Sequence, residues 1–411
     1  MFLQARLDAF THAVRSQMAL PLRVELWNGK QIDFSDAAPR VTVRVPHASA
    51  LRYLLTPSLD NLGSAYVEGL IDVKGKPADM IDIVTRLAGA KVGKRGRVER
   101  IRRHFTHSRA GDAAAVRYHY DVSNEFYATW LDPNMVYSCA YFEQGDEDLG
   151  QAQTKKIDHI LTKLALRPGM RLLDIGCGWG ALVLRAAEHY HARCVGITLS
   201  ENQAVLARAR AARAGLGHLI EIRVQDYRDV DGQFDRITSV GMFEHVGVRQ
   251  LPAYFARMHA LLTPDGLAMN HGLTSTDHGN GESPLGGGAF IERYVFPQGE
   301  LAHLGTVISA MQQGGLETLD VENLRRHYVR TMALWSANFE SQAGAIAGLT
   351  DVRRFRIWQV YLAGCQHAFR NDWISLYQIV CGRAGRDPSA LPWSRRHMYP
   401  TSASPAVVAH I

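Results

Sequence analysis

One nine-residue stretch constrains the fold of this chain more than any other. Residues 172–180, Leu-Leu-Asp-Ile-Gly-Cys-Gly-Trp-Gly, carry an apolar run directly into three glycines at alternate positions, and a helical pattern follows. Glycines in such a turn permit unusual backbone angles and let a ligand approach the main chain closely. The spacing is not the Gly-x-Gly-x-x-Gly of dinucleotide sites, and no phosphate-binding lysine follows it. The stretch predicts a strand–turn–helix unit at a ligand crevice, where Asp174 suits a cationic amino acid group such as that of methionine.

Strand-like and helix-like patterns alternate on both sides of this stretch, which is typical of a doubly wound α/β sheet. Helical patterns over residues 201–214 and 251–262 lie between the strand-like runs. Two long helical patterns, 327–347 and 351–371, interrupt the alternation near the end of the chain. Seven strands are expected, at residues 171–175, 193–198, 220–225, 234–240, 266–272, 317–321 and 375–380.

The first 90 residues follow a different pattern, that of a small α+β unit. Residues 21–27 and 41–45 alternate with period two, and Asn28-Gly29 is a strong hairpin signal. Helical spacing follows over residues 51–65 and 77–87. We therefore expect an N-terminal binding or docking domain over residues 1–90, a basic linker over 91–111 and a catalytic domain over 112–411.

Composition narrows the class of protein. At 411 residues the chain suits two domains, and we find no apolar run long enough to span a membrane and no secretory signal at its start. The five cysteines are odd in number and form no Cys-x-x-Cys pair, which favours reduced thiols, a cytoplasmic location and no metal site.

The formal net charge of +6 is concentrated between Lys91 and Arg109, where eight basic residues stand against the single acid Glu99. Such a block can bind nucleic acid, bind an anionic membrane, or be a solvated linker.

Polar residues end the strands next to the glycine turn. Thr198, Leu199 and Gln203 follow the second strand, and Ser200 is placed to cap the next helix. Gln225, Asp226 and Tyr227 end the third strand, where Asp226 could accept a hydrogen bond from an adenine amino group. Three such groups at the carboxyl ends of successive strands predict a ligand crevice.

Residues 150–320 resemble the class I S-adenosylmethionine-dependent methyltransferases, except that no acid ends the second strand, where Thr198 and Gln203 are expected to replace it. Further motifs are residues 119–127, His-Tyr-Asp-Val-Ser-Asn-Glu-Phe-Tyr; 130–133, Trp-Leu-Asp-Pro; 137–142, Tyr-Ser-Cys-Ala-Tyr-Phe; 241–247, Gly-Met-Phe-Glu-His-Val-Gly; and 327–331, His-Tyr-Val-Arg-Thr. Together with the glycine turn they resemble the cyclopropane fatty acyl phospholipid synthase family, related to the mycolic acid cyclopropane synthases, over nearly the whole chain.

The resemblance implies a seven-stranded class I methyltransferase sheet with inserted helices, S-adenosylmethionine as cofactor, and a homodimer. It also implies a carbocation chemistry in which a lipid double bond takes the cofactor's methyl carbon and closes a cyclopropane ring. A bound bicarbonate would remove the proton, held by Cys139, Glu244, His271 and Tyr328 with the backbone near Leu273. The cofactor residues would be Tyr137, Ser138, Asp174, Gly176, Gly178, Gly180, Thr198, Leu199, Gln203, Gln225, Asp226 and Tyr227.

Three functions remain open at this point. The first is cyclopropanation of acyl chains in phospholipids, with the N-terminal domain and the basic segment 91–109 docking on the inner face of the membrane. The second is a methyl-branched or methylene product from the same carbocation. The third is an RNA methyltransferase, which is disfavoured because residues 241–244, Gly-Met-Phe-Glu, stand where an Asn-Pro-Pro-Tyr-like motif would follow the fourth strand.

Two features have a structural and a functional interpretation. The long Gly- and Ser-rich segment 274–290 is either a lid, the mark of a subgroup with a different product, or a tolerated insertion. Aromatic rings near the first motif either stabilise a cation or simply pack in the core. These rings are Tyr118, Tyr120, Phe126, Tyr127, Trp130, Tyr137, Tyr141 and Phe142.

Overall fold

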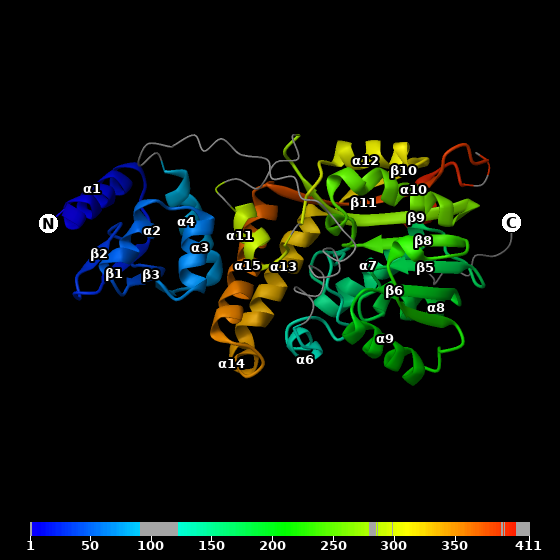
Figure 1. Ribbon diagram of the computed structural model, residues 1–411, viewed down its shortest axis with the longest axis horizontal. Coiled ribbons are helices and arrows are strands. Elements are labelled where there is room, and N and C mark those ends of the chain that lie inside the picture. The colour runs from blue at the N-terminus through cyan, green and yellow to red at the C-terminus, as the bar shows by residue number, and fades with distance from the viewer. Residues whose placement is uncertain are drawn as a thin grey trace. The chain divides into compact units, whose positions relative to one another are not determined.

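The computed structural model describes residues 2–90, 122–278, 285, 287–297, 299–387, 389 and 391–399. The basic segment 91–109, Tyr118, Tyr120 and the centre of the 274–290 segment lie outside the described residues. The chain forms two compact units (Figure 1). The N-terminal unit consists of Met1–Thr106, Gly281–Pro297 and Met332–Trp373, and the sheet unit of His107–Asn280, Gln298–Thr331 and Ile374–Ile411.

The sheet unit contains a seven-stranded sheet in the order β10-β11-β9-β8-β5-β6-β7. Neighbouring strands from β7 to β9 are parallel, whereas β11 is antiparallel to both β9 and β10. The predicted doubly wound, seven-stranded fold is confirmed. The strands are β5 (Arg171–Ile175), β6 (Arg193–Thr198), β7 (Ile220–Val224), β8 (Phe234–Val240), β9 (Leu262–Ser275), β10 (Leu316–Asn323) and β11 (Ile374–Arg383).

Helices cover both faces of this sheet, and each face has its own buried apolar core. Figure 1 shows α10 and α12 on one side and α8 and α9 on the other. Ser200 caps α9 as predicted, because its hydroxyl accepts a hydrogen bond from the Gln203 amide. The helices are α6 (Asn124–Ala128), α7 (Leu149–Lys163), α8 (Ala181–Tyr190), α9 (Glu201–Arg213), α10 (Leu251–Leu261) and α12 (Leu304–Gln313).

The N-terminal unit contains a four-stranded sheet in the order β2-β1-β3-β4. The predicted hairpin at Asn28-Gly29 is present, with β1 antiparallel to β2 and Gly29 at φ +81°. The single helix expected over residues 51–65 is wrong: α2 ends at Leu55 and α3 starts after Ser58, because Pro57 interrupts the helical pattern. The elements are α1 (Phe2–Gln17), β1 (Leu22–Leu26), β2 (Gln31–Asp33), β3 (Val41–Val45), α2 (Leu51–Leu55), α3 (Leu59–Val67), β4 (Asp72–Lys74) and α4 (Pro77–Gly89).

Later segments of the chain complete the N-terminal unit. They comprise α11 (Gly287–Tyr294), the C-terminal part of α13 (Arg325–Ser341), α14 (Ala343–Ala347) and α15 (Val352–Arg370). The Tyr66 hydroxyl donates to Gln359 Oε1 at 2.6 Å, and Arg356 pairs with Asp72 at 3.0 Å. This division differs from the single catalytic domain expected over residues 112–411.

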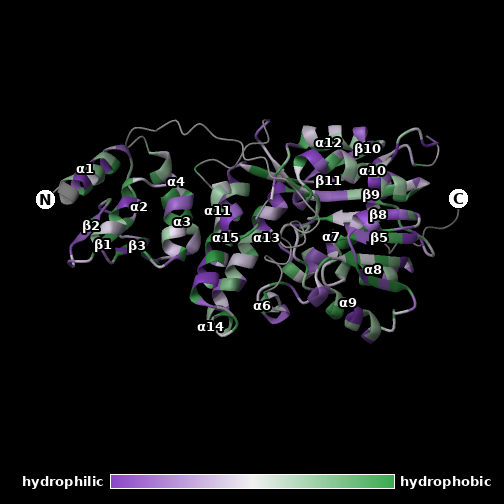
Figure 2. Cartoon of the chain, viewed as in Figure 1, coloured by the Kyte–Doolittle hydropathy of each residue, from purple (hydrophilic) through white to green (hydrophobic). Residues whose placement is uncertain are grey.

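Two expectations about helices need correction. The segment 274–290 is not wholly without secondary structure, since α11 begins at Gly287. The helix expected over 327–347 starts earlier and ends at Ser341, before the short α14. Figure 2 shows hydrophilic residues beside hydrophobic ones on the helices. No helix within the described ranges is long and apolar enough to cross a membrane.

Candidate active site

A cavity of about 170 Å³ lies at the carboxyl ends of β5, β6, β7 and β8, where the strand order reverses around β5. This is the position at which doubly wound sheets bind ligands. Most of the predicted cofactor residues line it: Tyr137, Ser138, Asp174, Gly176, Gly178, Thr198, Leu199, Gln203, Gln225, Asp226 and Tyr227.

Gly180 is the predicted cofactor residue that does not line this cavity. It precedes α8 with φ +84°, and a Cβ atom there would lie 3.0 Å from the Cβ of Ala207. The third glycine of the turn therefore serves the close packing of α8 against α9.

Two oppositely charged side chains are buried at one end of the cavity. Asp174 accepts a 2.7 Å hydrogen bond from the Thr238 hydroxyl, and burial raises the pKa of its carboxyl to about 6. Lys156 on α7 donates a 2.7 Å hydrogen bond to the Ser138 hydroxyl, and burial lowers the pKa of its ammonium group to about 8. An acid and a base of this kind match the amino and carboxylate groups of an amino acid ligand.

Sequence reasoning missed Lys156. It lies among Ala152, Ile157 and Ile160 on the buried face of α7. Lysine is almost never fully buried without a partner, so a lysine in register with an apolar helix face is a signal that could have identified it.

The polar groups at the other end of the cavity are already oriented by protein contacts. The Thr198 hydroxyl donates to Gln203 Oε1 at 2.7 Å, which links the two residues predicted to replace the missing acid. Arg228 binds both carboxylate oxygens of Asp226, at 2.8 and 2.7 Å. A hydrogen bond from an adenine amino group to Asp226 stays a prediction.

The four predicted catalytic residues are all buried and lie beside the cofactor cavity rather than in its lining. Two of them meet at the start of α13. The Cys139 thiol donates weakly to the Leu324 carbonyl at 3.8 Å, and the Tyr328 amide donates to the same carbonyl at 3.0 Å. Cys139 directly follows Ser138, which does line the cavity, so this pair adjoins it.

The other two each have a contact near the end of β9. Glu244 Oε1 accepts a 2.7 Å hydrogen bond from the Leu273 amide, two residues after His271. The Nδ1 atom of His271 lies 3.3 Å from the Gln378 side-chain nitrogen. The structure thus places Cys139 and Tyr328 at one carbonyl, that of Leu324, and holds Glu244 against the end of the strand that contains His271.

Burial keeps these groups close to neutral. It raises the pKa of Glu244 to about 7, lowers the pKa of His271 well below its usual range, and raises the pKa of the Cys139 thiol. Glu244 Oε2 and His271 Nε2 are buried without a hydrogen-bond partner in the part of the chain that the structure describes. An unsatisfied buried polar atom costs about 1–3 kcal/mol, so both atoms favour a small polar ligand.

Other polar groups near the end of β9 share this property and were not anticipated. Asn270 and Thr274 on β9, and the side-chain oxygen of Gln378 on β11, are buried without partners among the described residues. Alternating polar residues inside a central strand are the sequence signal that could have revealed them.

The aromatic motif forms a wall at one end of the cavity. Tyr127 packs against Tyr137 and Trp179, with ring centroids 5.6 and 5.0 Å apart, and the latter two rings line the cavity. Phe126 and Trp130 are fully buried behind them, which supports the packing interpretation for these two rings.

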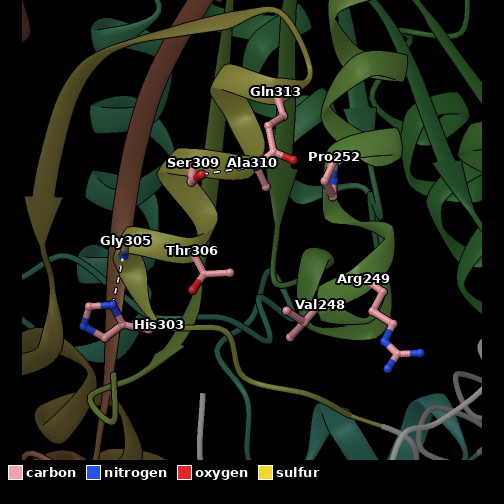
Figure 3. A pocket seen from close by; sticks show the side chains of 9 residues that line it. All are labelled: Val248, Arg249, Pro252, His303, Gly305, Thr306, Ser309, Ala310 and Gln313. Carbon is pink, nitrogen blue, oxygen red and sulfur yellow. Dashed lines mark hydrogen bonds between the residues drawn. The ribbon is translucent and has the colours of Figure 1, made fainter. Parts of the chain in front are cut away.

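A second, more open cavity of about 510 Å³ lies between α10 and α12 (Figure 3). His303 Nδ1 accepts from the Gly305 amide at 3.1 Å, and Ser309 accepts from Gln313 at 3.2 Å. Its polar side chains are half-buried or exposed, and it contains none of the predicted site residues. Nothing in its geometry marks it as the reaction site.

Comparisons with known proteins identify the family of this chain. The sequence model of the mycolic acid cyclopropane synthetase family matches residues 107–379, and a domain of unknown function matches residues 9–95. A protein of Pseudomonas putida named probable fatty acid methyltransferase is 44% identical over 92% of this chain and 96% of its own length. The cyclopropane-fatty-acyl-phospholipid synthase of Escherichia coli is 32% identical over 87% of this chain and 92% of its own length.

A solved structure extends the likeness to three dimensions. Mycolic acid cyclopropane synthase, crystallised with SAH and CTAB, is 37% identical and superposes with a TM-score of 0.63 over 66% of this chain and 97% of its own. S-adenosylhomocysteine is the product that S-adenosylmethionine leaves after methyl transfer, so this likeness supports the same cofactor here. The predicted resemblance is confirmed.

Proposed function

This chain belongs to the mycolic acid cyclopropane synthetase family, and we propose on that premise that it is a cyclopropane-fatty-acyl-phospholipid synthase. It transfers the methyl carbon of S-adenosylmethionine to a cis double bond in the acyl chains of membrane phospholipids. The ring then closes as a proton leaves the added carbon.

One observation carries the proposal. Beside the residues that line the cofactor cavity, two buried polar atoms, Glu244 Oε2 and His271 Nε2, have no partner among the described residues. Ordinary methyl transfer to nitrogen or oxygen does not require polar atoms to be held ready for a base. Methylation of an alkene does, because the proton to be removed is bonded to carbon.

The proposed reaction forms and breaks bonds in two steps. The π electrons of the double bond form a bond to the methyl carbon, the carbon–sulfur bond breaks, and S-adenosylhomocysteine departs. A carbocation remains, and loss of a proton from the new methyl group supplies the electrons that close the ring. Bicarbonate, when bound, would supply the base for that proton.

The buried atoms of Glu244 and His271 that lack a partner among the described residues suit such an anion. Neutral His271 with a proton on Nε2, the Tyr328 hydroxyl and the Cys139 thiol are donors to an oxyanion. Glu244, whose pKa is near 7, can accept the hydroxyl proton of the anion. The chain's own residues therefore bind, orient and hold a proton, and the surrounding apolar core excludes water.

Docking on a bilayer is part of the same proposal. Acyl chains lie within the membrane, so the enzyme must work at its surface from the cytoplasmic side. The basic segment 91–109 would attract anionic headgroups with about 1 kcal/mol per basic residue. The N-terminal domain would provide the rest of the docking surface, and the active species would be a homodimer.

A second product is favoured by another relative. The tuberculostearic acid methyltransferase of Mycobacterium tuberculosis is 34% identical over 90% of both chains. Its name denotes a methyltransferase for a fatty acid. The same carbocation here would give a methyl-branched or methylene-substituted chain if the proton left a different carbon.

Product analysis distinguishes the two. The full chain is incubated with methyl-labelled S-adenosylmethionine, bicarbonate and liposomes of cis-monounsaturated phospholipid, and the lipids are examined by mass spectrometry and proton NMR. Labelled ring methylene with loss of vinyl protons supports cyclopropanation. Label in a branch methyl or exocyclic methylene supports the second product instead of the cyclopropane. Unlabelled lipid rejects both proposed products.

A further inference from the structure

We propose that His327, as a neutral imidazole, is a positioning residue that fastens the segment carrying Cys139 to the helix carrying Tyr328. The activity readout of its test rests on the proposed methyl transfer, whereas the structural readout does not.

Three contacts join residues 139–142 to one side of α13 and the residue before it. The Cys139 thiol reaches the Leu324 carbonyl at 3.8 Å, and the Ala140 amide donates to the Thr331 hydroxyl at 3.1 Å. The Phe142 amide donates to Nδ1 of His327 at 3.0 Å. Positions 324, 327 and 331 are spaced by three and four residues, so they form a single face of the helix.

Ring stacking holds the same segment from both sides. The Tyr141 ring lies between His159 of α7, with centroids 4.2 Å apart, and His327, with centroids 4.8 Å apart and planes inclined by 11°. The Tyr141 amide also donates to the Ala152 carbonyl at 3.0 Å. The segment is therefore clamped between α7 and α13, and His327 supplies both a ring face and an acceptor.

The acceptor role fixes the chemical state of His327. A backbone amide can only donate, so Nδ1 must present its lone pair and the proton must be on Nε2. Protonation of Nδ1 would set one N–H against another and break the contact with Phe142. The clamp exists only while the imidazole is neutral.

The surroundings favour the neutral form. Burial lowers the pKa of His327, and the electrostatic effects of His159 from α7 and Arg326 from its own helix act in the same direction. Glu322 from β10 and Glu147 from the loop before α7 oppose them. The phenol of Tyr141 faces the ring, and Arg330 lies over Phe142 at 5.1 Å.

The consequence is specific to one half of the site. Release of Phe142 would loosen the segment that carries Cys139 on α13 and leave only the contacts of Cys139 and Ala140 to position it beside Tyr328. The cofactor side would persist, because Gln153 of α7 independently binds the carbonyls of Val136 and Ser138, at 3.2 and 2.8 Å.

Two substitutions test this in the full chain. In His327→Asn, the amide oxygen replaces Nδ1 as an acceptor that does not titrate, whereas His327→Leu keeps bulk and removes the acceptor. His218→Asn, at an exposed histidine before β7, is the matched control. Methyl transfer to phospholipid and affinity for S-adenosylhomocysteine are measured between about pH 5 and about pH 8.5, the range that brackets histidine titration.

We expect His327→Leu to lose at least about tenfold in rate with unchanged cofactor affinity, as for one lost hydrogen bond. His327→Asn should retain most of the rate at high pH. Its rate relative to the native chain should rise as the pH falls below the ordinary histidine value of 6.5. The titrations of Asp174 and Glu244 cancel in that ratio.

Amide hydrogen exchange of residues 137–145 gives a readout independent of turnover. The protection factor of Phe142 should fall on acidification in the native chain and stay constant in His327→Asn. The proposal is overturned if His327→Asn and His218→Asn show the same rate relative to the native chain, and the same protection factor of Phe142, at every pH. Absence of any lipid methylation by the native chain rejects the proposed function instead, and the exchange measurement still decides the role of His327.

Discussion

The ammonium group of Lys156 lies 2.7 Å from the hydroxyl of Ser138, inside the cavity that also contains the carboxyl of Asp174. Its side chain is almost entirely excluded from solvent. Burial lowers the pKa of this ammonium group, and the attraction of Asp132 and Asp174 offsets that effect only in part, so the site favours a further negative charge. We interpret Lys156 as the partner of the cofactor's carboxylate.

Replacement of Lys156 by Met should therefore weaken cofactor binding. The loss of one charge-assisted hydrogen bond corresponds to an affinity reduced by about tenfold to a hundredfold. Calorimetric titration with S-adenosylhomocysteine measures it. Lys155→Met removes the neighbouring lysine, which pairs with Glu143 and Glu147 outside the cavity, and should leave the affinity unchanged. Equal affinities in the two variants would contradict this assignment.

Asp174→Asn should abolish cofactor binding and yet stabilise the cofactor-free protein at neutral pH. The folded-state pKa of about 6 exceeds the ordinary value of 3.8, so the folded protein binds the proton more tightly than the unfolded chain. The ionised carboxyl thus destabilises the fold above about pH 6, on the order of 1–3 kcal/mol. The variant should melt higher than the native chain at pH 7, and the difference should shrink towards acid pH. A variant that melts lower at pH 7 would contradict it.

Glu244→Gln should separate binding from turnover. The amide preserves the acceptor for the Leu273 amide but cannot accept a proton, so the rate of methyl transfer should fall by at least about a hundredfold. Affinity for S-adenosylhomocysteine should stay within about twofold, since the side chain lies outside the cofactor cavity. Glu221→Gln on β7, an exposed carboxylate, is the control. Full activity of Glu244→Gln would remove this residue from the mechanism.

Gly180→Ala tests the glycine that the sequence assigned to the cofactor. Its left-handed backbone and the 3.0 Å approach to Ala207 predict a loss of about 1–3 kcal/mol in the free energy of unfolding. Gly178→Ala shares the strain of a left-handed backbone (φ +53°), but its Cβ meets nothing within 4 Å, so it should lose less stability and should also reduce cofactor affinity because Gly178 lines the cavity. Denaturant titration and calorimetry of both variants provide the comparison. If Gly178→Ala lost more stability and Gly180→Ala lost more cofactor affinity, the two roles would be reversed.

Local patterns predicted the parts of this structure that local physics determines. Three elements each depend only on residues within a few positions, so the local sequence was enough to predict them. They are the strand over residues 171–175, the cap at Ser200 and the hairpin at Asn28-Gly29. The carboxyl edge of the sheet followed from them, because parallel strands place their ends together.

The remainder depends on contacts between distant positions. Lys156 is significant only because α7 presents it to Ser138, and Tyr66 meets Gln359 across 293 positions. The resemblance located Cys139 and Tyr328, but it did not show that Leu324 and His327 hold them together. No periodicity encodes these pairings.

The N-terminal unit is built from three separate segments of the sequence, and this affects how the protein would respond to a protease. A single cut between residues 90 and 122 would sever the backbone without freeing residues 2–90. Tyr66, Glu68 and Asp72 would still be held by Gln359, Arg353 and Arg356 of α15. The two fragments should co-elute as one particle under native conditions and part only in denaturant.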